Sequence, residues 1–110
     1  MEETTQTIEQ QIQQQIDENP ILLYMKGTPQ FPQCGFSSRT VDVLKACQKK
    51  FAFVNVLMDQ EVRANLPKVS NWPTFPQLFI NGELVGGCDI VTEMAESGEL
   101  QKLVDAAAVE

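Results

Sequence analysis

Cys34, Lys26 and Ser37 lie in one short stretch whose residue types could support sulfur chemistry. Cys34 follows a segment rich in proline and glycine, which separates an apolar run from an amphipathic one. This order predicts a strand-to-helix connection with Cys34 at or just before the helix N-terminus, where free N–H groups and the helix dipole favour a thiolate. With Lys26 as a nearby cation, the pKa of such a thiol can fall from about 8.5 to roughly 3.5–7.5, and the thiolate attacks disulfides and binds metals.

The spacing from Cys34 to Ser37 is that of a Cys-x-x-Cys redox motif in which serine replaces the second cysteine. A motif with two cysteines closes an internal disulfide and expels its substrate, which Ser37 cannot do. Ser37 can cap the helix or donate a hydrogen bond toward the Cys34 sulfur. Cys34 must therefore be resolved by an external thiol, by another cysteine of the chain or by a metal. A purely structural role is disfavoured, because buried cysteines usually lie on apolar stripes.

Two further stretches could bind a ligand. In Thr74-Phe75-Pro76 the proline is a candidate cis peptide, which would expose the backbone of Phe75 to an extended peptide; the alternative is an ordinary turn. Cys88-Asp89 follows two glycines and opens a helix. Asp89 could simply be the N-cap, or it could hold a ligand amine while free N–H groups bind a carboxylate. Cys88 could be a second reactive thiol.

Three other residues have a structural interpretation beside the functional one. Arg63, on an expected short helix, could be a solvated surface charge, or it could bind a carboxylate together with Lys26. Cys47 has helical spacing from an apolar neighbour and is expected in the core. Trp72, beside a proline, is expected to pack rather than to border a ligand.

The composition limits the other chemistry that the chain can carry. Its 110 residues include three cysteines and no histidine, which removes Ser/His and Cys/His catalytic pairs and histidine zinc sites. The odd cysteine count and an N-terminus without a signal-peptide pattern argue against a disulfide framework and indicate a cytoplasmic protein. The net charge of -7, without a basic run, disfavours nucleic acid as a partner. No apolar run approaches the ~20 residues of a membrane span, so no membrane partner is expected.

The pattern of apolar residues predicts a single domain over residues 1–110 with an α/β fold. Apolar runs at 21–25 and 51–57, joined by a helix from about Gly35 to Lys49, indicate a parallel βαβ unit. Strands at 77–80 and 83–86 flank Asn81-Gly82, a strong signal for a two-residue hairpin turn. Further helices are expected before Asn19-Pro20, from Gln60 to a stop at Pro67, at about 90–96 and after Ser97-Gly98. Together these elements predict a four-stranded mixed sheet flanked by helices, which is the thioredoxin-like arrangement.

Three stretches together closely resemble the single-domain monothiol glutaredoxins with a Cys-Gly-Phe-Ser active site. They are Lys26 to Ser37, Trp72 to Gln77 and Gly86 to Asp89, and the likeness covers about residues 5–105. The resemblance implies a thioredoxin-like domain that binds glutathione, with Cys34 meeting the glutathione sulfur or an iron. It also implies the following contacts: Lys26 and Arg63 with the glycyl carboxylate, Phe75 with the peptide backbone, and Cys88 and Asp89 with the γ-glutamyl end.

The same resemblance implies an iron–sulfur cofactor and protein partners. Members of this family form a homodimer around a 2Fe–2S cluster ligated by one active-site cysteine and one glutathione from each side. They also form mixed clusters with BolA-like proteins and pass clusters to acceptor proteins. The residue chemistry agrees, because four thiolates are a normal ligand set for such a cluster and Cys34 is one well-placed thiolate.

Two main functions remain open at this point. The first is an iron–sulfur carrier with Cys34 as its metal ligand. The alternative is a glutathione-dependent thiol-disulfide oxidoreductase that uses Cys34 alone or with Cys88 as resolving thiol. A third, weaker hypothesis is a redox sensor that is switched by a disulfide between Cys34 and Cys88. Ser37 and the five-residue insertion from Thr28 to Pro32 favour the carrier, because both are ill-suited to fast turnover. At most weak oxidoreductase activity is expected.

Overall fold

The computed structural model describes residues 7–107, in which five helices surround a four-stranded sheet. The strand order is β2-β1-β3-β4, with β1 parallel to β2 and antiparallel to β3, and β3 antiparallel to β4. The predicted four-stranded mixed sheet is therefore confirmed. None of the helices in this part of the chain is long and apolar enough to cross a membrane. The elements are α1 (Ile8–Glu18), β1 (Ile21–Met25), α2 (Gly35–Ala46), β2 (Ala52–Asn55), α3 (Gln60–Ser70), β3 (Gln77–Ile80), β4 (Glu83–Gly86), α4 (Cys88–Ser97) and α5 (Glu99–Ala107).

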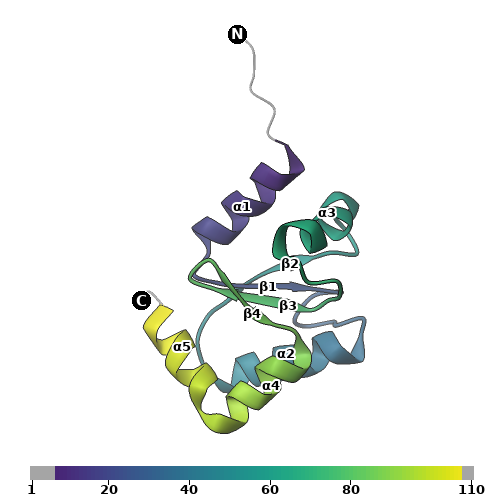
Figure 1. Cartoon of the computed structure of the whole chain (residues 1–110). Helices are drawn as coiled ribbons and strands as arrows, with labels where there is room; N and C mark the ends of the chain where they lie inside the picture. Colours follow the sequence, from purple (N-terminus) through teal and green to yellow (C-terminus); the bar gives the residue numbers. More distant parts are fainter. Residues whose placement is uncertain (1–6, 108–110) are drawn as a thin grey trace.

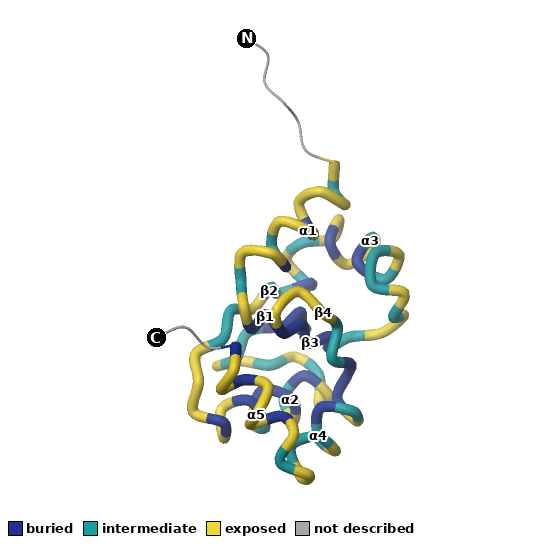
Figure 2. The backbone as a smooth tube through the Cα atoms, turned by 60° about the vertical axis from the view of Figure 1, so that its left-hand side comes forward, coloured by how far each residue is buried: buried dark blue, intermediate teal, exposed yellow. Residues whose placement is uncertain are grey.

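The sheet separates two helical layers: α1 and α3 cover one face, and α2, α4 and α5 cover the other (Figure 1). Successive side chains of a strand point to opposite faces. Leu23 and Met25 of β1 accordingly pack in the core under α2, α4 and α5, whereas Leu22 and Tyr24 pack under α1 and α3. Buried positions therefore run along β1 and β3, and exposed ones lie on the outer sides of the helices (Figure 2). The C-terminal end of β1, where Lys26 begins the next loop, is thus anchored in both cores.

Helix α3 does not end at Pro67, as the sequence suggested, but continues to Ser70. A proline inside a helix removes one hydrogen bond and crowds the preceding turn. Here Val62 and Leu66 before the proline and Val69 after it pack against the same core, and this packing holds the helix across the proline. The helix ends at Asn71, which adopts a left-handed conformation with φ 57°.

Several other predicted boundaries also differ from the structure. Helix α2 ends at Ala46 rather than near Lys49, because Gln48 has a left-handed φ of 62°. Strand β2 is shorter than 51–57, because the Asn55 side chain accepts the N–H of Leu57 and bends the chain there. Helix α4 begins at Cys88 rather than near residue 90. The hairpin turn is as predicted, with φ values of 52° at Asn81 and 82° at Gly82.

Candidate functional site

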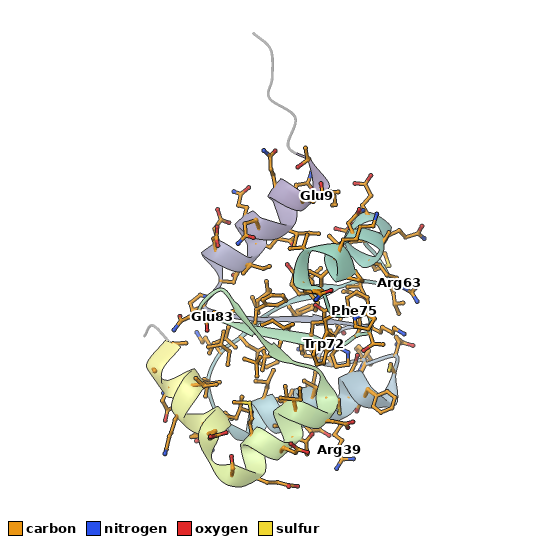
Figure 3. All side chains as sticks on the ribbon, viewed as in Figure 1. Glu9, Arg39, Arg63, Trp72, Phe75 and Glu83 are labelled. Atoms are coloured by element: carbon orange, nitrogen blue, oxygen red, sulfur yellow. The ribbon has the colours of Figure 1, made fainter. Side chains whose placement is uncertain are left out.

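An open cleft of about 630 Å³ lies beside the ends of β1, α3 and α4 and the N-terminus of α2. Figure 3 shows the labelled Arg63, Phe75 and Trp72 on this side of the molecule, whereas Glu83 lies toward the opposite end of the sheet. The six residues that the resemblance assigns to glutathione or iron come from four separate segments, and all of them line this one cleft: Lys26, Cys34, Arg63, Phe75, Cys88 and Asp89. Phe36, Pro67, Trp72, Pro73, Thr74, Pro76, Gly87 and Ile90 complete its lining.

Cys34 is the N-cap residue of α2, as the sequence predicts, with extended backbone angles of φ -153° and ψ 139°. Its thiol makes no capping hydrogen bond in the structure, but a thiolate there would face the free N–H groups of the first turn. The pKa of Cys34 is lowered, mainly by the backbone N–H of Ser37, with smaller contributions from Phe36 and the charge of Lys26, and burial opposes them in part. Cys34 is therefore a partly exposed thiol that ionises more readily than usual.

The other two cysteines differ from Cys34 in position and exposure. Cys47 is buried in the core, as predicted, and its exposed fraction is 7%. Burial, followed by the charge of Asp105, raises the pKa of Cys47. Cys88 is also buried, with 8% of its surface exposed, but it borders the same cleft as Cys34. Among the described residues all three thiols are free.

Ser37 has a structural role that the sequence did not reveal. Its side chain is fully buried, and its hydroxyl oxygen accepts the backbone N–H of Lys26 at 3.1 Å. The hydroxyl proton remains available to donate to the Cys34 thiolate, and it contributes to the lowered pKa of that residue. Ser37 therefore joins the loop that carries Lys26 to the helix that carries Cys34.

The loop between Lys26 and Cys34 is fixed by internal hydrogen bonds and by Asn55. Thr28 and Phe31 exchange backbone hydrogen bonds, and Lys26 accepts one from the N–H of Gln33 at 2.9 Å. The side chain of Asn55 accepts the N–H of Gly27 at 2.9 Å. Gly27 has φ 95°, and a Cβ there would lie 2.5 Å from the carbonyl oxygen of Phe31, so only glycine fits. Sequence reasoning missed Asn55, because it treated this residue as an ordinary part of a strand.

The segment from Trp72 to Pro76 forms one wall of the cleft. The Phe75–Pro76 peptide bond is cis, in agreement with the prediction. The Phe75 N–H donates no hydrogen bond to another residue in the range 7–107, so it is free for a ligand. Trp72 is half-buried, lies beside Gly87 and also borders the cleft.

The segment Gly87-Cys88-Asp89 forms the opposite wall, where α4 begins. Gly87, and not Asp89, is the N-cap, and it has no side chain to satisfy the first N–H groups of the helix. A Cβ on Gly87 would lie 3.2 Å from the Trp72 indole nitrogen, so glycine allows this close approach. Asp89, in the first turn of α4, is exposed at the cleft. The geometry therefore offers free N–H groups and one carboxylate side by side.

The charges in the cleft suit a ligand that carries both carboxylate and amine groups. Two of the lining residues are cationic, Lys26 and Arg63, and one is anionic, Asp89. Neither cation is in an ion pair; the salt bridge found among residues 7–107 joins Lys49 to Asp105. Within the same residues, no cluster of three or more histidine, cysteine, aspartate or glutamate side chains could hold a metal by itself.

Comparison with known proteins gives the relationship of the whole chain. The glutaredoxin family pattern matches residues 21–85. Glutaredoxin 4 of Escherichia coli K12 is 61% identical over 102 residues, which are 93% of this chain and 88% of that protein. The solution structure of reduced poplar apo GrxS14 has a TM-score of 0.76 and 46% identity over 88% of this chain and 89% of its own. A buckwheat glutaredoxin–glutathione complex has a TM-score of 0.80 and 25% identity over 94% of this chain and 93% of its own. With Cys34-Gly35-Phe36-Ser37 at the start of α2, the chain belongs to the glutaredoxin family and is of its monothiol type.

Proposed function

We propose that the cleft binds glutathione, and that Cys34 together with the glutathione thiolate holds one side of a 2Fe–2S cluster shared between two chains. The observation that carries this proposal is the placement of one readily ionised thiol, one carboxylate and two cations without an ion-pair partner among residues 7–107 around a single cleft. The protein would then act mainly as a carrier that passes clusters to acceptor proteins.

The cleft matches glutathione in size and in charge. Its volume of about 630 Å³ lies within the ~300–1,000 Å³ usual for small-molecule sites. Glutathione carries two carboxylates, one amine and one thiol. Lys26 and Arg63 would bind the glycyl carboxylate, and the N-terminus of α4 with Asp89 would bind the γ-glutamyl carboxylate and amine beside Cys88. Phe75 would pair with the peptide backbone, and the related buckwheat glutaredoxin is known as a glutathione complex.

The donor set also fits a shared cluster better than a cluster held by one chain. A 2Fe–2S cluster takes four thiolates in its common form. Cys34 is the one cysteine that is both at the cleft and partly exposed, and Cys47 is on the far side of the core. Two chains and two glutathione molecules would therefore complete the ligand set. Such a cluster is cargo for iron–sulfur proteins, and Cys34 needs only to bind and release it.

The proposed partners follow from this arrangement and from the family. They are a second copy of the chain when cluster is bound, a BolA-like protein that could replace that copy, and iron–sulfur acceptor proteins. The proposed compartment is the cytoplasm.

A second candidate function is glutathione-dependent thiol–disulfide exchange, and one observation favours it: Cys34 and Cys88 border the same cleft. The Cys34 thiolate would take the glutathionyl group from a mixed disulfide and release the substrate thiolate. A second glutathione thiolate would then remove that group as oxidised glutathione. With an oxidant that accepts two electrons, Cys34 and Cys88 could instead form a disulfide, as a redox sensor would.

The two functions are separated by size-exclusion chromatography with absorbance at visible wavelengths. The protein is reconstituted without oxygen in the presence of iron, sulfide and glutathione. We expect a coloured dimer that reverts to a colourless monomer when the cluster is removed, and Cys34→Ser should give neither colour nor dimer, because a hydroxyl is a poor ligand for this metal site. Cys47→Ser is the matched control and should behave as the unmodified protein. A coloured Cys34→Ser variant, or a stable dimer without cluster, would contradict the proposal.

A further inference from the structure

Gln77 is a fully buried polar side chain directly behind the cleft. It is the first residue of β3, has no exposed surface and does not line the cleft. Its Nε2 atom donates to the carbonyl oxygens of Trp72 at 2.9 Å and Thr74 at 3.0 Å. Both partners are acceptors only, so the amide nitrogen must face them and the Oε1 atom must face away. One side chain therefore ties two points of the cleft wall to the sheet.

The cleft wall needs such a support because it cannot form its own hydrogen-bond ladder. Pro73 and Pro76 lack N–H groups, so the segment between α3 and β3 has few backbone donors of its own. The Gln77 amide supplies the two protons that the carbonyls of Trp72 and Thr74 require. Its Oε1 atom is buried and accepts no hydrogen bond from residues 7–107, so the orientation of the amide is set by its two donated bonds.

The contact with Thr74 fixes the direction of the next N–H group. The Thr74 carbonyl and the Phe75 N–H belong to the same peptide unit, which is planar and trans, so they point in opposite directions. Because the Thr74 carbonyl is held toward buried Gln77, the Phe75 N–H points away from it. Thr74 and Phe75 both line the cleft, and the Phe75 N–H has no hydrogen-bond partner among residues 7–107.

From this geometry we infer that Gln77 is a positioning residue for ligand binding, which holds the Phe75 N–H toward the cleft for the backbone of a bound peptide. The inference rests on the proposed glutathione site and adds a residue that never touches the ligand. Gln77 acts through the Thr74–Phe75 peptide plane, so its loss should weaken binding even though every residue lining the cleft is unchanged.

Two substitutions of Gln77 separate this role from a purely structural one. Gln77→Leu removes both donated protons and carries no titratable group. Gln77→Glu keeps the shape, but its carboxylate repels both carbonyl oxygens. Burial and those carbonyls should raise the pKa of the new carboxyl group, and once protonated it can donate one hydrogen bond again. Binding by Gln77→Glu should therefore recover as the pH falls, whereas binding by Gln77→Leu should not.

The measurement is the affinity for reduced glutathione, by calorimetry at pH 7.5 and pH 5.5. We expect both variants to bind about two- to tenfold more weakly at pH 7.5, the effect of one hydrogen bond. At pH 5.5 only Gln77→Glu should approach the unmodified protein. The matched control is Gln15→Met on α1, away from the cleft, which removes the amide oxygen that accepts a hydrogen bond from the Tyr24 hydroxyl at 2.8 Å. It should leave the affinity unchanged at both pH values.

A second readout does not depend on glutathione at all. Residual dipolar couplings report the direction of the Phe75 N–H bond, which should change in Gln77→Leu and stay fixed in Gln15→Met. If the unmodified protein bound no glutathione while this bond turned in Gln77→Leu, the proposed function would fail and the positioning role would stand. A folded Gln77→Leu protein with unchanged affinity and an unchanged Phe75 bond direction would overturn the inference. If Gln77→Leu does not fold, the pH dependence of Gln77→Glu decides, and equal weakening at both pH values would count against the positioning role.

Discussion

Replacing Ser37 by alanine should destabilise the protein although it removes only one oxygen atom. The Ser37 hydroxyl accepts the Lys26 N–H at 3.1 Å from a fully buried position. An unsatisfied buried donor costs about 1–3 kcal/mol, and since Lys26 is partly accessible to water we expect the lower end, about 1 kcal/mol. Alanine also gains about 0.5 kcal/mol of helix propensity over serine, which hides part of the loss.

Ser38→Ala is the control for the gain in helix propensity, because Ser38 is the next residue of the same helix and its side chain makes no hydrogen bond within residues 7–107. Urea unfolding followed by circular dichroism gives both free energies. With a slope of roughly 1–3 kcal/mol per molar urea, a 1 kcal/mol difference between the two variants moves the midpoint by about 0.3–1 M. Equal stability of Ser37→Ala and Ser38→Ala would refute the coupling between the Lys26 loop and α2.

The remaining predictions concern the charges and thiols of the cleft. Lys26→Ala and Arg63→Ala should each weaken glutathione binding about ten- to a hundredfold, and the loss should be larger at low ionic strength. Arg39→Ala, on the outer side of α2, is the control and should leave the affinity unchanged. Calorimetry that shows unchanged affinity for the first two variants would place the glycyl carboxylate of glutathione elsewhere. Turnover in a glutathione–disulfide reductase assay should be weak and should rise in Ser37→Cys. No rise would mean that the geometry of the loop before Cys34, and not the missing second thiol, limits turnover. The rate of Cys34 alkylation should increase with pH around a midpoint below that of an ordinary thiol, because the Ser37 N–H is the main group that lowers the pKa of Cys34. A midpoint at the ordinary value would contradict the explanation that the first turn of α2 stabilises the thiolate.

The fold was predictable because its main signals are local. The apolar run of β1, the Asn81-Gly82 turn and the Asn19-Pro20 stop after α1 each mark one element without help from distant residues. The errors arose where packing outweighs local preference. Pro67 should end a helix by itself, but Leu66 before it and Val69 after it both pack on the core and hold α3 together.

The candidate site was predictable as a set of residues but not as a network. The position of Cys34 at a helix start could be predicted from the prolines and glycines around it, which separate the apolar run from the amphipathic one. The roles of Asn55, Ser37 and Gln77 could not, because each depends on which backbone group lies within hydrogen-bond distance after folding. A polar residue at a strand end or inside a helix gives no sign in the sequence of the N–H or carbonyl that it will meet.

The central claim is that each chain supplies one ligand, Cys34, to a cluster shared by two chains. Native mass spectrometry of the protein reconstituted without oxygen tests this claim most directly, because it counts every component of the complex. The predicted mass is that of two chains, two glutathione molecules, two iron atoms and two sulfides, and no such species should form with Cys34→Ser. A cluster bound to a single chain, or a dimeric cluster complex that lacks glutathione, would contradict it.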